Sequence, residues 1–169
     1  PIFSHRASPF SFYGPKRKVP LTVSLAELPH IDLVVISHNH YDHLDTATVT
    51  ALANQPGGPP RFLVPLGLDT WFAGEGVHGA QTVTAMDWWD DEQIDSAGAG
   101  AQVFFVPVRH WSSRGLFDRN ETLWGGWVII ADGLRIFFAG DTGYSGDFAE
   151  IGARFGGFDL ALIPVGAYE

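Results

Sequence analysis

The sequence contains no cysteine, few basic residues and no long hydrophobic run. Without cysteine, the chain has neither disulfides nor thiolate metal ligands. Its 10 Lys and Arg residues against 19 Asp and Glu give a net charge of −9, which repels the phosphate backbone of nucleic acid. No apolar run approaches the roughly 18 residues of a membrane-spanning helix, and no signal peptide is visible. We expect no nucleic-acid partner, and a cytoplasmic or membrane-peripheral location rather than secretion.

The composition is that of a globular, turn-rich protein. Hydrophobic residues make up 46% of the 169 residues, with 20 Gly and 11 Pro. This length predicts a single domain over residues 1–169. Because the net charge gives no bulk attraction to anionic lipid, any membrane contact has to be local and apolar. Five of the six tryptophans could line an apolar entrance for lipid, or could simply be core residues: Trp88, Trp89, Trp111, Trp124 and Trp127.

A dense group of potential metal ligands follows the apolar run 31–36. His38, His40, Asp42 and His43 lie within six positions. If the chain stays extended after Ser37, strand alternation points the first three to one side. Imidazole and carboxylate are ligands of Zn²⁺, Fe and Mn²⁺, and four such groups exceed the needs of one ion. The pattern predicts a two-metal site, and the alternative is a polar loop of hydrogen-bonded histidines.

The remaining pattern alternates strands and helices and then becomes rich in strands. Asp45 is the expected N-cap of the first helix, and Asp132-Gly133 favours a type I′ hairpin turn. The acidic aromatic segment 87–92 is expected to be a surface turn. The predicted strands are 31–36, 61–66, 82–86, 102–108, 127–131, 134–138 and a last, buried strand at 158–164, and the predicted helices lie near 46–54, 69–73 and 148–155.

This order of elements predicts an α/β sandwich with a mixed sheet. Three polar groups stand at strand ends: the histidine cluster, His110 and Asp141. We expect them to converge at one edge of the sheet, where α/β folds place their sites. Taken alone, His110 is equally compatible with a core histidine, and Asp141, between glycines, with a turn residue.

These residues resemble a known family. His38-Asn-His40-Tyr-Asp42-His43 is similar to the H-x-H-x-D-H signature of the metallo-β-lactamase superfamily, an αββα sandwich. Further motifs resemble its N-acyl-phosphatidylethanolamine-hydrolysing phospholipase D branch over nearly the whole chain. These are Arg6-Ala-Ser-Pro9, Gly14-Pro-Lys-Arg17, Met86-Asp-Trp-Trp89, His110-Trp111, Leu123-Trp-Gly125, Phe137-Phe-Ala-Gly-Asp-Thr-Gly-Tyr144 and Phe158-Asp-Leu-Ala with Ile163-Pro-Val-Gly-Ala-Tyr-Glu169.

The resemblance implies a ligand set and a reaction. His38, His40 and His110 would hold one zinc, Asp42 and His43 the second, and Asp141 would bridge them. A hydroxide shared by the two ions and oriented by Asp42 would attack the phosphodiester and yield phosphatidic acid. Fe or Mn could replace zinc in such a site. The substrate would be an N-acyl phosphatidylethanolamine-like phospholipid, reached by peripheral membrane contact.

The sequence departs from the family at its end. The family supplies one more metal-binding histidine well after the Gly-Ala-Tyr-Glu stretch, whereas this chain stops at Glu169. His5, His30 and His78 do not replace it convincingly. We therefore expect a C-terminally incomplete fold, the N-terminal and central part of the whole, with uncovered apolar sheet surface. A complementing C-terminal segment or an oligomer would cover that surface.

The predicted function is thus a zinc-dependent phosphodiesterase of phospholipase D type. The enzymatic alternative is a metal-dependent lactone or ester hydrolase using the same residues. The alternative from another class is an inactive, truncated metal-binding module.

Overall fold

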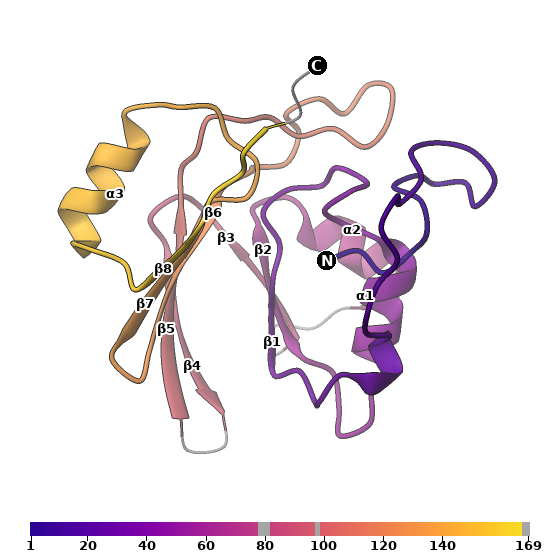
Figure 1. Ribbon diagram of the computed structural model, residues 1–169, viewed down its shortest axis with the longest axis horizontal. Helices are drawn as coiled ribbons and strands as arrows, with labels where there is room; N and C mark the ends of the chain where they lie inside the picture. The colour runs from indigo at the N-terminus through magenta and orange to yellow at the C-terminus, as the bar shows by residue number, and fades with distance from the viewer. Residues whose placement is uncertain (78–81, 97–98, 167–169) are drawn as a thin grey trace.

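The computed structural model describes residues 1–77, 82–96 and 99–166. His78 and the final Ala167-Tyr168-Glu169, which entered the sequence predictions, lie outside these ranges. Two β-sheets face each other, and helices cover their outer faces (Figure 1). The chain therefore forms the predicted αββα sandwich.

The first sheet contains three parallel strands in the order β1-β2-β3: β1 (Leu33–Val35), β2 (Arg61–Pro65) and β3 (Val83–Met86). Its crossover helices are α1 (Thr46–Ala53) and α2 (Asp69–Gly74), and a 3₁₀ turn, η1 (Leu25–Glu27), precedes β1. Residues 1–24 form a long loop with an isolated bridge between Arg6 and Lys16. The predicted elements of this half are confirmed, with ends that shift by one or two residues.

The second sheet has five strands in the order β4-β5-β6-β7-β8. They are β4 (Asp91–Ser96), β5 (Ala99–Val106), β6 (Gly126–Ala131), β7 (Leu134–Phe138) and β8 (Leu160–Leu162), and the last helix is α3 (Asp147–Phe155). Pairing is antiparallel up to β7, and β7 pairs with β8 in parallel. The β6–β7 turn has positive φ at Asp132 (50°) and Gly133 (77°), as the predicted type I′ turn requires.

The core lies in three layers, and alternation along β2 illustrates why. Phe62 and Val64 pack in the cluster that contains α1 and α2, whereas Leu63 points the other way and packs with Phe105 and Trp127 of the second sheet. A third cluster joins the outer face of that sheet to α3. Because both faces of β2 are covered, it reads as a continuous apolar run.

One prediction for the second sheet is right only in part, and another is wrong. In the segment 87–92, which was expected to be a surface turn, residues 87–90 do form a turn, with the Asp90 N–H donating to Asp87 O (3.1 Å), but β4 begins at Asp91 and pairs with β5 along its whole length. Among residues 91–95 of this strand the side chains are mostly polar and exposed, and Ile94 is buried. The last strand was expected to be buried, yet Leu160 and Leu162 are 50% and 49% exposed. β8 is the edge strand of its sheet, with β7 on one side.

The tryptophans divide between core and surface. Trp127 is completely buried, whereas Trp111 is 39% exposed. Among the described residues, no helix is both long and apolar enough to cross a lipid bilayer.

Candidate metal centre

The segment 37–44 follows β1 and leads to the start of α1. Hydrogen bonds hold its start from both sides: the Ile36 N–H donates to Leu63 O (3.0 Å) and Trp127 Nε1 donates to Ile36 O (3.0 Å). At its far end, the Asp45 carboxylate accepts from the Thr48 N–H (3.1 Å) and caps α1, as predicted. We call residues 37–44 the metal loop.

His38, His40 and His110 form the first group of potential ligands, with one nitrogen from each within 4.8 Å of the others. His110 follows β5, and its neighbour Arg109 is bound to the loop after β7. The Gly143 N–H donates to Arg109 O (2.9 Å), and the Arg109 N–H donates to Thr142 Oγ1 (3.0 Å). These bonds hold the His110 loop beside the loop that carries Asp141.

His38, His43 and Asp141 form the second group, again within 4.8 Å of one another. The His43 Nε2 atom lies 3.1 Å from Asp141 Oδ2. The side chains of His43 and Asp141 are 22% and 38% exposed, so this group opens to solvent. The predicted convergence of the histidine cluster, His110 and Asp141 at one sheet edge is therefore observed.

Two glycines let the second sheet approach the metal loop closely. A Cβ on Gly140, which has a φ of +62°, would lie 2.6 Å from the Ser37 Cβ. The Gly125 N–H donates to Ser37 O (2.9 Å), and a Cβ there would meet the Phe105 ring at 2.4 Å. Glycine is required at both positions by this backbone packing, which sets where Asp141 stands relative to His38.

Burial favours the neutral form of three of the site's histidines, His38, His40 and His110. Burial, reinforced by the neighbouring His43, His110 and His40, lowers the pKa of His38 to about 2. Burial also lowers the pKa of His40 and of His110. A neutral imidazole keeps the lone pair that a metal ligand must offer.

Unpaired nitrogens test whether a metal fits these residues. The Nε2 atoms of His38 and His40 are buried and have no hydrogen-bond partner. The other ring nitrogen of His38, Nδ1, lies 3.0 Å from Ser37 Oγ, which orients the ring. An unsatisfied buried polar atom costs about 1–3 kcal/mol, and a metal ion would satisfy both. Histidine nitrogens and a carboxylate oxygen are a donor set suited to zinc, iron or manganese, so the residues fit a metal.

The Asp42 side chain does not lie where the sequence predicted. Strand alternation predicted that it would point to the same side as His38 and His40, but residues 41–43 form a turn, with the His43 N–H donating to His40 O (3.0 Å). The Asp42 carboxylate is 61% exposed and lies 3.7 Å from His43 Nε2. It belongs to neither three-residue group and stands at the rim of the site. Its role, like the ligand roles of the other five residues, stays a prediction.

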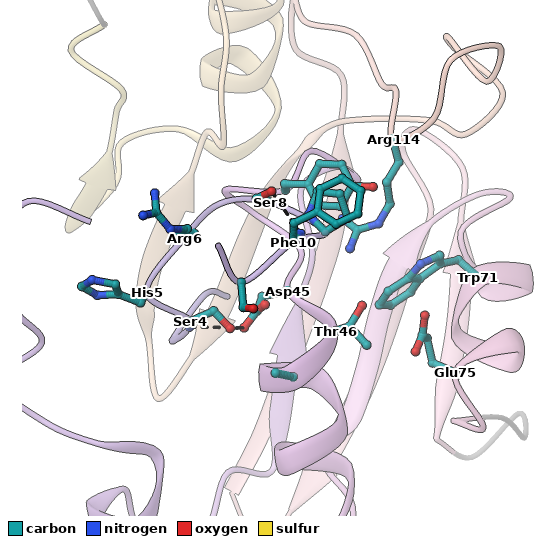
Figure 2. A pocket seen from close by; sticks show the side chains of 14 residues that line it. Ser4, His5, Arg6, Ser8, Phe10, Asp45, Thr46, Trp71, Glu75 and Arg114 are labelled. Atoms are coloured by element: carbon teal, nitrogen blue, oxygen red, sulfur yellow. Dashed lines mark hydrogen bonds between the residues drawn. The ribbon is translucent and has the colours of Figure 1, made fainter. Parts of the chain in front are cut away.

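The structure adds residues that the sequence analysis missed. Ser37 orients His38, and Arg114 reaches the metal loop from behind. The Arg114 side chain extends into a cavity of about 630 Å³ that Tyr41 and Trp71 also line (Figure 2). No predicted ligand lines this cavity, so it lies behind the metal loop and apart from the histidine cluster. No sequence motif marks Arg114, because its contacts span 70 or more residues.

Residues 3–169 match the family model described as "Beta-lactamase superfamily domain". The chain belongs to the β-lactamase superfamily. The superfamily resemblance of the H-x-H-x-D-H segment is thereby confirmed.

Named relatives of this β-lactamase superfamily chain include two phospholipases. It is 41% identical over 172 residues to N-acyl-phosphatidylethanolamine-hydrolyzing phospholipase D 1 of Caenorhabditis elegans, covering 100% of this chain and 48% of the relative. It is 35% identical over 158 residues to the mitochondrial enzyme of that name from Saccharomyces cerevisiae, covering 92% of this chain and 33% of the relative. The chain spans less than half the length of these curated relatives.

A solved structure agrees with the fold. The metallo hydrolase Igni18 of Ignicoccus hospitalis aligns with a TM-score of 0.66 at 23% identity, covering 87% of this chain and 58% of that one. At this identity the likeness supports the superfamily's α/β architecture alone.

Proposed function

We propose that this protein is a zinc-dependent phosphodiesterase of phospholipase D type, acting on N-acyl phosphatidylethanolamine-like phospholipids. The observation that carries the proposal is that His38 belongs to both three-residue groups. Because both groups include His38, the two candidate metal positions lie next to each other, as a dinuclear hydrolase requires, although the imidazole itself is assigned to the first ion. The substrate class is supported by the 41% identity to the Caenorhabditis elegans phospholipase along the whole chain.

The six predicted residues divide the work of holding the ions. His38, His40 and His110 would hold one zinc, and Asp42 and His43 the second, with Asp141 between them. When bound, two zinc ions lower the pKa of water toward neutrality and stabilise negative charge on an attacked phosphorus. Asp42, exposed at the rim, accepts a hydrogen bond from the attacking water and orients it. The water oxygen bonds to phosphorus, and the N-acylethanolamine oxygen leaves with a proton, which leaves phosphatidic acid.

A lipid substrate implies contact with a lipid surface, and we include peripheral membrane contact in the proposal. The loop after His110 supports it, because Leu116 and Phe117 are 92% and 93% exposed. Large exposed apolar side chains on a loop are typical of interaction sites. A complementing segment or a second copy, over the exposed β8 edge, stays part of the proposal.

The first experiment measures metal content on protein purified without added metal, by elemental mass spectrometry. We expect about two zinc ions per chain. The same protein is then assayed on a bis-aryl phosphodiester, on N-acyl phosphatidylethanolamine in vesicles, and on a lactone. Zinc-dependent release of phosphatidic acid is the expected result.

The matched variant is Asp42→Asn, which keeps the side-chain shape and removes the charge. Because Asp42 is assigned both to the second ion and to the attacking water, we expect this variant to keep the first ion, to bind the second more weakly and to lose turnover by a factor of about 100 or more. If the protein hydrolyses the lactone and neither phosphodiester, it is a lactone or ester hydrolase and the proposed phosphodiesterase activity is wrong. Bound metal without turnover of any of the three substrates would favour the inactive metal-binding module.

A further inference from the structure

Arg114 binds the back of the metal loop at two points. Its Nη1 atom donates hydrogen bonds to Asn39 O (3.0 Å) and to Leu44 O (2.7 Å). These two carbonyls stand on either side of the segment from His40 to His43. Hydrogen bonds from a charged donor are stronger than neutral ones, so one guanidinium closes the ends of the turn that carries the ligands.

Two aromatic rings fix where the guanidinium stands. Its central carbon lies 4.1 Å from the centroid of the Tyr41 ring and 5.0 Å from that of Trp71. Tyr41 is itself part of the metal loop, whereas Trp71 belongs to α2. Figure 2 shows Arg114 extending into the cavity near Trp71. A planar guanidinium can stack on an aromatic face, whereas a lysine ammonium has no flat face.

The backbone of Arg114 is held by an acidic residue four positions later. The Asp118 carboxylate accepts hydrogen bonds from the Arg114 N–H (3.0 Å), the Gly115 N–H (2.7 Å) and Ser113 Oγ (2.8 Å). Although partial burial acts in the opposite direction, these bonds hold the pKa of Asp118 below its usual range. The carboxylate therefore stays charged near neutral pH and fixes the turn from which Arg114 projects.

We propose that Arg114 is a positioning residue for the metal centre, holding the segment from Asn39 to Leu44 in the shape that aims His40 and His43 at the ions. This inference rests on the proposed metal-dependent function. Within the described residues, the turn itself has backbone hydrogen bonds from the N–H groups of His43 and Leu44, both to His40 O. Without Arg114, two loop carbonyls lose their donor and the ring of Tyr41 loses its partner, so the ligands would spread over several orientations.

The test compares metal affinity in Arg114→Met with that of the unaltered protein, by competition against a chromophoric zinc chelator. We expect at least tenfold weaker zinc binding. Residues that orient the metal's ligands, without touching the metal themselves, change metal affinity by about 10–100-fold when they are mutated. Arg114→Lys should recover part of the loss, since an ammonium can donate to the carbonyls but cannot stack on Tyr41. A merely structural role predicts a lower melting temperature with unchanged zinc affinity of the folded protein.

The matched control is Arg154→Met. Arg154 also covers a tryptophan, with its central carbon 3.7 Å from the Trp89 ring, and pairs with Glu150, but it lies on α3 away from the metal loop. Its zinc affinity should equal that of the unaltered protein. If Arg114→Met does not fold, Asp118→Ala takes its place. It releases the Arg114 turn from a partly exposed position, and about threefold weaker zinc binding is expected.

Zinc affinity within twofold of the unaltered protein, in folded Arg114→Met or in Asp118→Ala used in its place, would overturn the inference. The readout needs no substrate. A protein that hydrolyses no phosphodiester but loses zinc in Arg114→Met would contradict the proposed substrate and support the positioning role. A protein that binds no zinc at all would overturn both.

Discussion

The two ligand groups of the candidate metal centre differ in how the fold holds them. The first group, with His40 and His110, is buried in part, electrically neutral and fixed by neighbouring backbone. The second group depends on His43 and Asp141, which are partly exposed and whose Nε2 and Oδ2 atoms lie 3.1 Å apart. His38, only 1% exposed, joins the two. If the site binds two ions as proposed, the buried half would hold its ion firmly and the exposed half would give water and substrate access.

The largest effect is expected for His38→Ala, because it removes the residue that both groups share. Zinc content should fall from about two ions per chain to less than one, and phosphodiester hydrolysis should fall by a factor of about 1000 or more. Elemental mass spectrometry and a bis-aryl phosphodiester assay check both values. His30→Ala, at an exposed position outside the metal loop, serves as the control. Retention of two ions in His38→Ala would show that the two groups are independent.

His43→Ala should separate the halves. It removes a ligand from the open group alone, so we expect about one zinc ion per chain to remain, held by His38, His40 and His110. Activity should fall by about 100-fold or more, because a single ion activates the water and stabilises the developing charge less well than two ions together. Isothermal titration calorimetry with zinc measures the number of ions bound per chain. Loss of both ions would mean that the first group is not rigid by itself.

Gly140→Ala tests the packing that sets the position of Asp141. The new Cβ would stand 2.6 Å from the Ser37 Cβ at a positive φ, and we expect a loss of about 1–3 kcal/mol in the free energy of unfolding, measured with urea. Gly133→Ala is the matched control. It also has a positive φ, but nothing lies within 4 Å of its added Cβ, so its loss should be smaller. Equal losses would remove the argument for close packing.

The smallest effect on stability is expected for Phe117→Ser, on the loop that follows His110. Because this side chain is 93% exposed, the free energy of unfolding should change by no more than about 0.5 kcal/mol. Cosedimentation with phosphatidylcholine vesicles should nevertheless fall by at least twofold if this loop meets the lipid. Leu134→Ser, at a half-exposed position on β7, is the control. Unchanged cosedimentation would direct the search for a lipid contact to another surface.

Local features of the site were predictable from the sequence. The spacing from His38 to His43, the Asp45 cap of α1 and the Asp132-Gly133 turn each depend on residues within a few positions of one another, where backbone preference and alternation act. The Asp45 cap and the Asp132-Gly133 turn are both observed as predicted. The convergence of His110 and Asp141 on the cluster was also predictable, because each follows an apolar strand and strand ends gather at a sheet edge.

Predictions failed where neighbours distant in the sequence decide the outcome. β4 has a polar, exposed sequence and forms because β5 offers a partner along its whole length. β8 has an apolar sequence, which predicts burial, but its place at the sheet edge leaves it exposed. Asp42 leaves the side of His38 and His40 because the loop turns one residue earlier than alternation assumes.

By itself, then, the sequence determined the ligand types, their spacing and the order of the elements, because these depend on chemistry within short stretches of chain. Only the tertiary structure decided that His38 is shared by two groups, that Asp42 stands at the rim and that Arg114 closes the back of the loop. The position of Asp42 depends on the turn at residues 41–43. The other two depend on which segments pack together across 70 residues or more, and such contacts arise from the burial and close packing of the whole core.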